Sequence, residues 1–139
     1  NSIAFDDEFT RHTLFRNFID PYSWHWQNGN ARWDILNVAR FCYAHKEEES
    51  LEWVKNDKNR PIFKLDQLAP ANNIEHTNAH DAMADVRATI GIAAIMKKSQ
   101  PKFFDYALSL NDKKEVNKQV RILHPMLLTN SLFGYKTSF

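Results

Sequence analysis

Two side chains near the middle of the chain, His80 and Asp85, are of the types that hydrolytic chemistry uses. An imidazole beside a carboxylate that holds a metal ion is a suitable general base for activating water. The two residues are five positions apart, about 500° around a helix, so they do not share one helical face. A histidine in the first turn can still point into a cleft that Asp85 borders. Taken alone, the pattern fits a structural histidine and a solvated aspartate better.

The element that would position Asp85 is a long helix opening near Asn78. Asn78 is a candidate N-cap, and Asp81 lies three residues later, where a capping box places its acid. An apolar stripe follows, formed by Met83, Val86, Ile90 and Ala93 and widened by Ala84, Ala88 and Ile92. A helix that is apolar nearly all round is buried, so we predict that Asp85 is buried. A buried carboxylate must be paired, hydrogen-bonded or bound to a metal.

A second group of acidic residues, Asp6, Asp7 and Glu8, opens a helix at the N-terminal end. Negative charge at a helix start complements the macrodipole, which is a sufficient structural explanation for the three acids alone. We predict that Phe15 and Phe18 face inward. The helix should end before Pro21, because the residue that precedes a proline avoids the helical region.

Aromatic residues follow this helix and alternate with cationic or titratable side chains. The group comprises Tyr22, His25, Arg32 and the tryptophans Trp24, Trp26 and Trp33. Aromatic rings near cations can stack unpaired bases and hold a nucleic-acid backbone. The alternative is that Trp24 and Trp26 are core residues beneath a loop, and the aromatic content alone favours that alternative.

The remaining sequence predicts mostly short elements. We expect a helix over 35–45 with Cys42 inward, a solvated loop over 46–61, a short helix from Phe63 to about Asn73, further short helices from Pro101, and strand from Val120 to Phe139. His76 is predicted to be a loop residue. The change of pattern near residue 101 is the candidate domain boundary.

Composition narrows the class of protein without identifying a substrate. Hydrophobic residues make up 43% and charged residues 25% of the 139 residues, as in ordinary globular proteins. A net charge of +1 gives no bulk attraction to nucleic acid. The single cysteine suits a reducing compartment, and with no signal sequence or apolar run of about 18 residues we expect a cytoplasmic protein without a membrane partner. The chain opens without Met and reads as a piece of a longer protein.

Several motifs together resemble those of one enzyme family, the DEDDh 3′–5′ exonucleases, and in particular its bacterial exodeoxyribonuclease I group. The motifs are Asn1-x3-Phe5-Asp6, Asp20-Pro21-Tyr22-x-Trp24-x-Trp26-Gln27, Ile74-Glu75-His76-x-Asn78-Ala79-His80-x4-Asp85 and Gln100-Pro101-x-x-Phe104-Asp105-Tyr106. The resemblance implies an α/β, ribonuclease H-like exonuclease fold that is partial and helix-rich here. Residues 1–100 would be the C-terminal part of the exonuclease domain, and residues 101–139 the start of an SH3-like domain.

The resemblance also implies site residues, a cofactor and partners. Asp6 and Asp85 would bind metal, His80 would be the general base, and Arg11 would contact phosphate. The complete enzyme would use two Mg²⁺ ions to degrade single-stranded DNA from the 3′ end to 5′-mononucleotides in DNA repair and recombination. A monomer is expected, with single-stranded DNA as substrate and a single-stranded-DNA-binding protein as a candidate partner.

One departure from the family pattern limits what this chain is expected to do. The family's first motif, an Asp-x-Glu pair on a strand, precedes everything in this sequence, so two of four metal-binding carboxylates are missing. The chain alone is therefore expected to be inactive, and the absent strands should leave the Met83, Val86 and Ile90 stripe exposed. Two alternatives stay open: a non-catalytic module that binds single-stranded nucleic acid, and a purely structural role in which His80 and Asp85 are satisfied in a core.

Overall fold

The computed structural model describes residues 6–76 and 81–126, and within these ranges the chain is helical. The elements are α1 (Asp6–Arg16), two 3-10 turns (Ser23–His25 and Gln27–Gly29), α2 (Ile35–Ser50), α3 (Leu65–Ala71), α4 (Ala82–Ser99), α5 (Pro101–Ser109) and α6 (Lys113–Gln119). The described residues contain no strand, only an isolated antiparallel bridge between Lys55 and Pro61. No helix among them is both long and apolar enough to cross a membrane.

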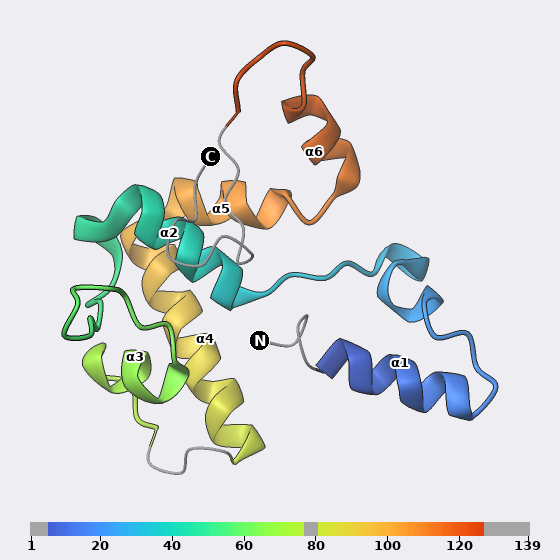
Figure 1. Ribbon diagram of the computed structural model, residues 1–139, viewed down its shortest axis with the longest axis horizontal. Helices are drawn as coiled ribbons and strands as arrows, with labels where there is room; N and C mark the ends of the chain where they lie inside the picture. Colours follow the sequence, from blue (N-terminus) through green and yellow to red (C-terminus); the bar gives the residue numbers. More distant parts are fainter. Residues whose placement is uncertain (1–5, 77–80, 127–139) are drawn as a thin grey trace.

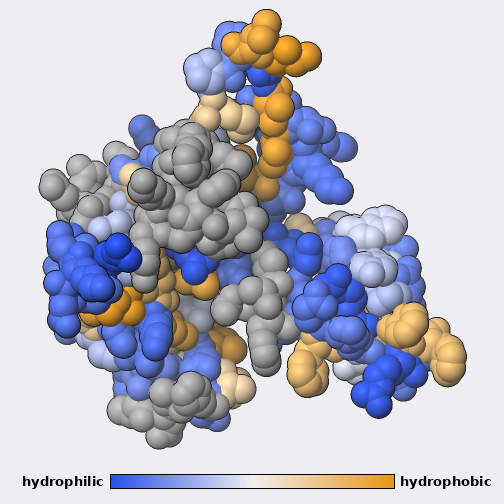
Figure 2. Space-filling view, in the orientation of Figure 1, coloured by the Kyte–Doolittle hydropathy of each residue, from blue (hydrophilic) through white to orange (hydrophobic). Residues whose placement is uncertain are grey.

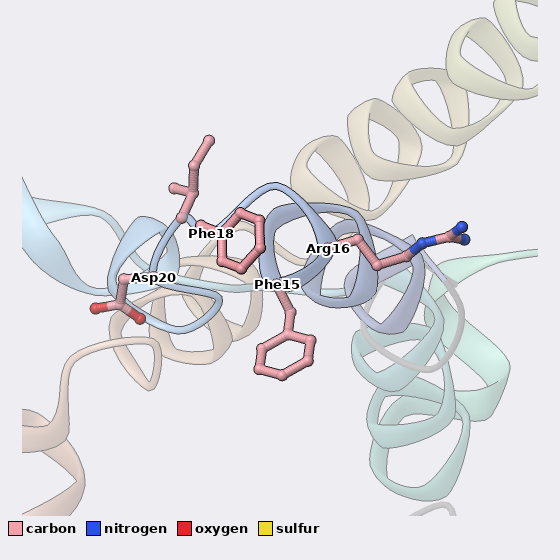
Figure 3. Close-up of a pocket in the computed structure, with 5 residues that line it drawn as sticks. Phe15, Arg16, Phe18 and Asp20 are labelled. Carbon is pink, nitrogen blue, oxygen red and sulfur yellow. The ribbon is translucent and has the colours of Figure 1, made fainter.

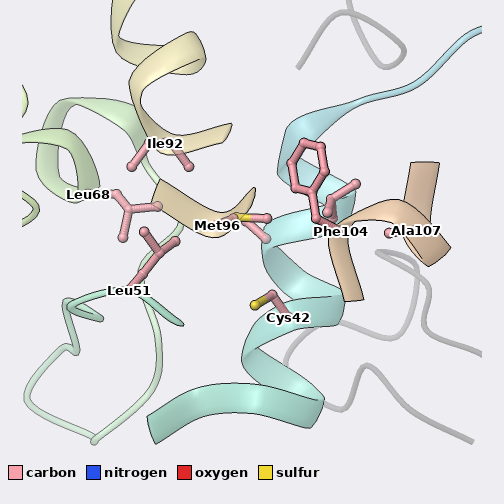
Figure 4. Packing of buried hydrophobic residues seen from close by; sticks show 9 residues of the cluster. Cys42, Leu51, Leu68, Ile92, Met96, Phe104 and Ala107 are labelled. Carbon is pink, nitrogen blue, oxygen red and sulfur yellow. The ribbon is translucent and has the colours of Figure 1, made fainter. Parts of the chain in front are cut away.

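The core forms where α2, α3 and α5 pack against α4, as Figures 1 and 4 show. Met96 of α4 and Cys42 of α2 have no exposed surface, and Ile92 is nearly as buried. The inward position of Cys42 is thus confirmed. Pro101 begins α5 directly after α4 ends, and Phe104 and Ala107 of α5 pack into the same core. The domain boundary near residue 101 stays a prediction.

The predicted solvated loop over 46–61 is wrong in two respects. Helix α2 continues to Ser50, and Leu51 directly after it is buried in the core. Trp53 and Phe63 then flank the loop and both contact the Tyr43 ring edge-on, with ring centroids 5.2 and 5.8 Å apart. Aromatic pairs favour this geometry, so the charged loop is anchored by rings at its two ends.

Helix α1 lies apart from this core, to which a long segment connects it (Figure 1). The predicted inward orientation of Phe15 and Phe18 is wrong, because both side chains are largely exposed and Phe18 completely so. Apolar side chains stand out over α1 in Figure 2. An ion pair between Arg32 and the buried Asp7 joins α1 to the segment before α2.

Trp33 secures the start of α2 to α5. Its indole Nε1–H donates to the carbonyl oxygen of Ala107 at 2.9 Å, and its ring meets Phe104 edge-on. Trp33 is therefore the tryptophan of the aromatic stretch that packs against the core. From 120 to 126 the chain forms irregular structure and a turn where strand was predicted, and residues 127–139 lie outside the described ranges.

Candidate active site

Asp85 lies in the first turn of α4, on a helix that begins later than predicted. Asp81, rather than Asn78, is the N-cap, because its side chain accepts a hydrogen bond from the backbone N–H of Ala84 at 3.1 Å. Asn78 itself lies outside the described residues. The predicted burial of Asp85 is wrong, since 44% of its side chain is exposed. A core role for Asp85 is thereby excluded.

Asp85 is exposed because a different face of α4 packs against the core. The core takes Ala88, Ile92 and Met96, all of which are buried. The neighbouring apolar stripe of Met83, Val86 and Ile90 is at least half exposed at each residue, which confirms the expected exposure of that stripe. The helix therefore has two apolar faces, and the described residues cover only one of them.

His76 contacts the candidate site residue Asp85, and sequence reasoning missed this contact. It belongs to the irregular segment after α3, but only 2% of its side chain is exposed. Its Nε2–H donates to Oδ1 of Asp85 over 2.7 Å, and its Nδ1 is buried without a hydrogen-bond partner in the described structure. The available signal was its position in the stretch Ile74-Glu75-His76 that belongs to the family motif.

Asp6 occupies the first position of α1, and its side chain is exposed. In the view of Figure 1 the N-terminal end of α1 is the end nearer α4. The two acids after Asp6 are engaged elsewhere, since Asp7 pairs with Arg32 and Glu8 with Arg11. Whether Asp6 and Asp85 share a metal stays a prediction, and His80 lies outside the described residues.

The described carboxylates are the type of ligand that Mg²⁺ prefers, but too few of them lie together to hold the ion. Mg²⁺ prefers oxygen ligands, and metal-binding carboxylates are commonly held by a second hydrogen-bond partner, as His76 holds Asp85. However, the described residues contain no group of three or more potential protein ligands. The metal-binding roles of Asp6 and Asp85 and the catalytic role of His80 therefore stay predictions.

The predicted substrate-contact residues are Arg11 in α1 and the two tryptophans of the segment after it. The Arg11 guanidinium lies 5.5 Å from the centre of the Tyr22 ring, which places it beside the aromatic segment. Trp24 is half-buried and donates its Nε1–H to the Pro21 carbonyl, whereas Trp26 is 60% exposed. Neither tryptophan is fully buried, so both remain able to present a ring edge or face. Their contact with DNA stays a prediction.

A shallow hollow lies at the C-terminal end of α1, between Phe15, Arg16, Phe18, Ile19 and Asp20 (Figure 3). The backbone N–H of Tyr22 donates to Asp20 at 2.8 Å and lowers the pKa of this carboxyl below its ordinary value. Asp20 therefore acts as a turn-forming carboxylate that stays ionised. None of these residues was predicted to be in the site.

Comparison with known proteins agrees with the motif pattern over almost the whole chain. Residues 1–93 match the model of the RNase_T exonuclease family. The exodeoxyribonuclease I of Haemophilus influenzae is 52% identical over 136 residues, and that of Escherichia coli is 46% identical. Each alignment covers 96% of this chain and 28% of the relative, so the chain spans just over a quarter of these relatives' length.

Solved structures give the same result for the fold. E. coli exonuclease I in complex with a dA16 oligonucleotide matches with a TM-score of 0.90 and 45% identity, covering 97% of this chain and 29% of that one. An ExoI/SSB-Ct complex matches over the same shares with a TM-score of 0.88 and 43% identity. The helices described above thus form a region of the exonuclease I fold. This chain belongs to the RNase T exonuclease family, as a homologue of exodeoxyribonuclease I.

Proposed function

We propose that the protein of which these residues are a part is a 3′–5′ exonuclease that degrades single-stranded DNA to 5′-mononucleotides in DNA repair and recombination. The observation that carries the proposal is the match to a DNA-bound exonuclease I structure over 97% of the chain. Asp85 supports it within the chain, because this carboxylate is both exposed and held by a buried partner. A single-stranded-DNA-binding protein is a candidate partner, by similarity to the ExoI/SSB-Ct complex.

The chain's own residues would divide the work between catalysis and substrate binding. Asp6 and Asp85 would hold Mg²⁺, which when bound neutralises charge on the reacting phosphodiester oxygens. His80 would accept the proton of the attacking water. Arg11 would contact phosphate, and the exposed ring of Trp26, together with Trp24, would stack unpaired bases.

A second function is favoured for the 139 residues by themselves. The described residues hold no group of three or more potential metal ligands. Without one of the two metal ions, the transition state loses several kcal/mol of charge stabilisation. Each loss of about 1.4 kcal/mol lowers the rate tenfold. The chain alone should therefore cleave single-stranded DNA poorly. We propose that it still binds such DNA, as a binding module, through Arg11 and the exposed ring of Trp26.

The test measures cleavage and binding on the same preparations. The purified chain is mixed with Mg²⁺ and end-labelled single-stranded DNA, and both mononucleotide release and fluorescence anisotropy are followed. Asp85→Asn is compared with Asp81→Asn, which removes a charge from the same helix start and keeps a good N-cap. The same variants are then assayed in the complete gene product.

Three outcomes separate the proposals. In the complete product, release that Asp85→Asn abolishes and Asp81→Asn preserves supports the exonuclease. Binding without release by the 139 residues supports the binding module for this chain alone. Absence of both DNA binding and release in the complete product would overturn both proposals.

A further inference from the structure

We infer that His76 is a positioning residue that fixes the Asp85 carboxylate in the orientation in which it binds a divalent cation; this inference rests on the proposed exonuclease function. The two residues come from different elements, nine positions apart, and are joined by the 2.7 Å hydrogen bond from Nε2–H to Oδ1. The imidazole is almost completely buried, while the carboxylate it holds is nearly half exposed. The donor is thus fixed by packing and the acceptor faces the surface.

The segment that carries His76 is placed by two features before it. Asn73 adopts a left-handed conformation, with φ of 58°, and ends α3 with its N–H bonded to the Pro70 carbonyl. Ile74 then packs directly on Gly91 of α4, where an added Cβ would lie only 3.0–3.2 Å from three Ile74 carbons. The absence of a side chain at Gly91 is what lets the segment approach the helix this closely.

The lengths of the two chain segments show that the Ile74–Gly91 contact brings His76 towards Asp85. Two residues, from Ile74 to His76, span at most roughly 6.6 Å. Six helical residues, from Gly91 back to Asp85, span about 9 Å. The segment therefore runs back along α4 towards its N-terminus, and the reach of an imidazole side chain closes the remaining gap to the carboxylate.

Stability alone does not account for burying this histidine. A hydrogen bond to a charged group stabilises a fold most when both groups are sheltered from water, and Asp85 is nearly half exposed. Within the described residues Nδ1 of His76 is buried without a partner, which opposes that gain. A buried unsatisfied group of this kind calls for another explanation. The same hydrogen bond fixes the orientation of the Asp85 carboxylate, whatever its net contribution to stability.

The expected effect is on metal affinity. Loss of the hydrogen-bond partner of a metal ligand typically weakens metal binding about 10–100-fold. The two informative variants are His76→Leu, which is apolar and of similar bulk, and His76→Gln, which keeps an N–H donor at the end of its side chain. Comparing the two separates loss of the donor from loss of packing.

The experiment has one readout without metal and one with it. By NMR on the full 139-residue chain, three-bond couplings report the side-chain rotamer of Asp85. We expect one rotamer in the wild type and in His76→Gln, and averaging in His76→Leu. Titration with Mn²⁺ alone, followed by broadening of the Asp85 amide signal, should require about 10–100-fold more metal in His76→Leu. His76→Gln should stay close to the wild type.

Failure of the inference can be told apart from failure of the proposed function. If His76→Leu keeps one rotamer and the wild-type Mn²⁺ affinity, the positioning role is overturned while the metal site stands. If Mn²⁺ broadens the wild type and Asp85→Asn equally, the metal role of Asp85 fails, and the inference with it. Should His76→Leu not fold, His76→Phe removes the donor and keeps an aromatic ring. One Asp85 rotamer and the wild-type Mn²⁺ affinity in that variant would equally overturn the inference.

Discussion

Replacing Gly91 by alanine tests the contact that places the segment before α4. The new Cβ would lie 3.0, 3.1 and 3.2 Å from Cδ1, Cγ2 and Cγ1 of Ile74. Carbon atoms at their preferred separation are about 3.5–4.0 Å apart, so Ile74 would have to move by roughly half an ångström. Two of the three atoms are γ carbons, which cannot withdraw by rotating the end of the side chain alone.

Two opposing contributions determine how Gly91→Ala changes the free energy of unfolding. Alanine in a helix interior is favoured over glycine by about 1 kcal/mol. Overpacking costs about 1–3 kcal/mol. We therefore expect Gly91→Ala to lower the free energy of unfolding by about 0–2 kcal/mol, against the helix-propensity trend. In an Ile74→Ala background the overlap is gone, and the same change should stabilise the protein by about 1 kcal/mol.

The assay is a double-mutant cycle. Urea unfolding of the wild type, both single variants and the double variant is followed by circular dichroism, and the coupling between positions 74 and 91 should be about 1–3 kcal/mol. If Gly91→Ala stabilises the wild type and the Ile74→Ala protein equally, Ile74 does not press on Gly91. The account of how His76 reaches Asp85 would then be wrong.

Three further outcomes are expected. Met96→Ala, at a fully buried position, should lower the free energy of unfolding by about 2–5 kcal/mol in urea, while Met83→Ala on the exposed face of the same helix should change it by under about 0.5 kcal/mol. Arg32→Ala leaves the buried Asp7 without its cation, so hydrogen exchange in α1 should accelerate while the α2–α5 core stays protected; equal acceleration in both would contradict this. Burial lowers the pKa of His45 from its ordinary 6.5, so the unfolded chain binds the proton more readily. Stability should fall as the pH drops below about 6.5, and His45→Leu should flatten that decline in pH-dependent unfolding; an unchanged slope would refute it.

The sequence predicted the helices that have clear local signals. A short helix was expected to begin at Pro101, and α5 does begin there, directly after the end of α4. The apolar spacing around Cys42 correctly predicted the buried face of α2, whose true end lies five residues further on. A run of charged residues is as compatible with a further helical turn as with a loop, so local composition could not place that end.

For the candidate site, too, some features follow from the sequence and others only from tertiary packing. The motif residues alone identified the family, because family motifs depend on residue types at fixed spacing. The metal-binding role of Asp85 that they imply stays a prediction. The sequence could not determine which of two apolar faces of α4 packs, so the burial of Asp85 was predicted wrongly. That choice depends on how α2, α3 and α5 pack around α4, which local sequence does not specify. The hydrogen bond between His76 and Asp85 was decided only by tertiary structure, since it requires the left-handed turn at Asn73 and the space above Gly91 to bring an irregular segment against the helix.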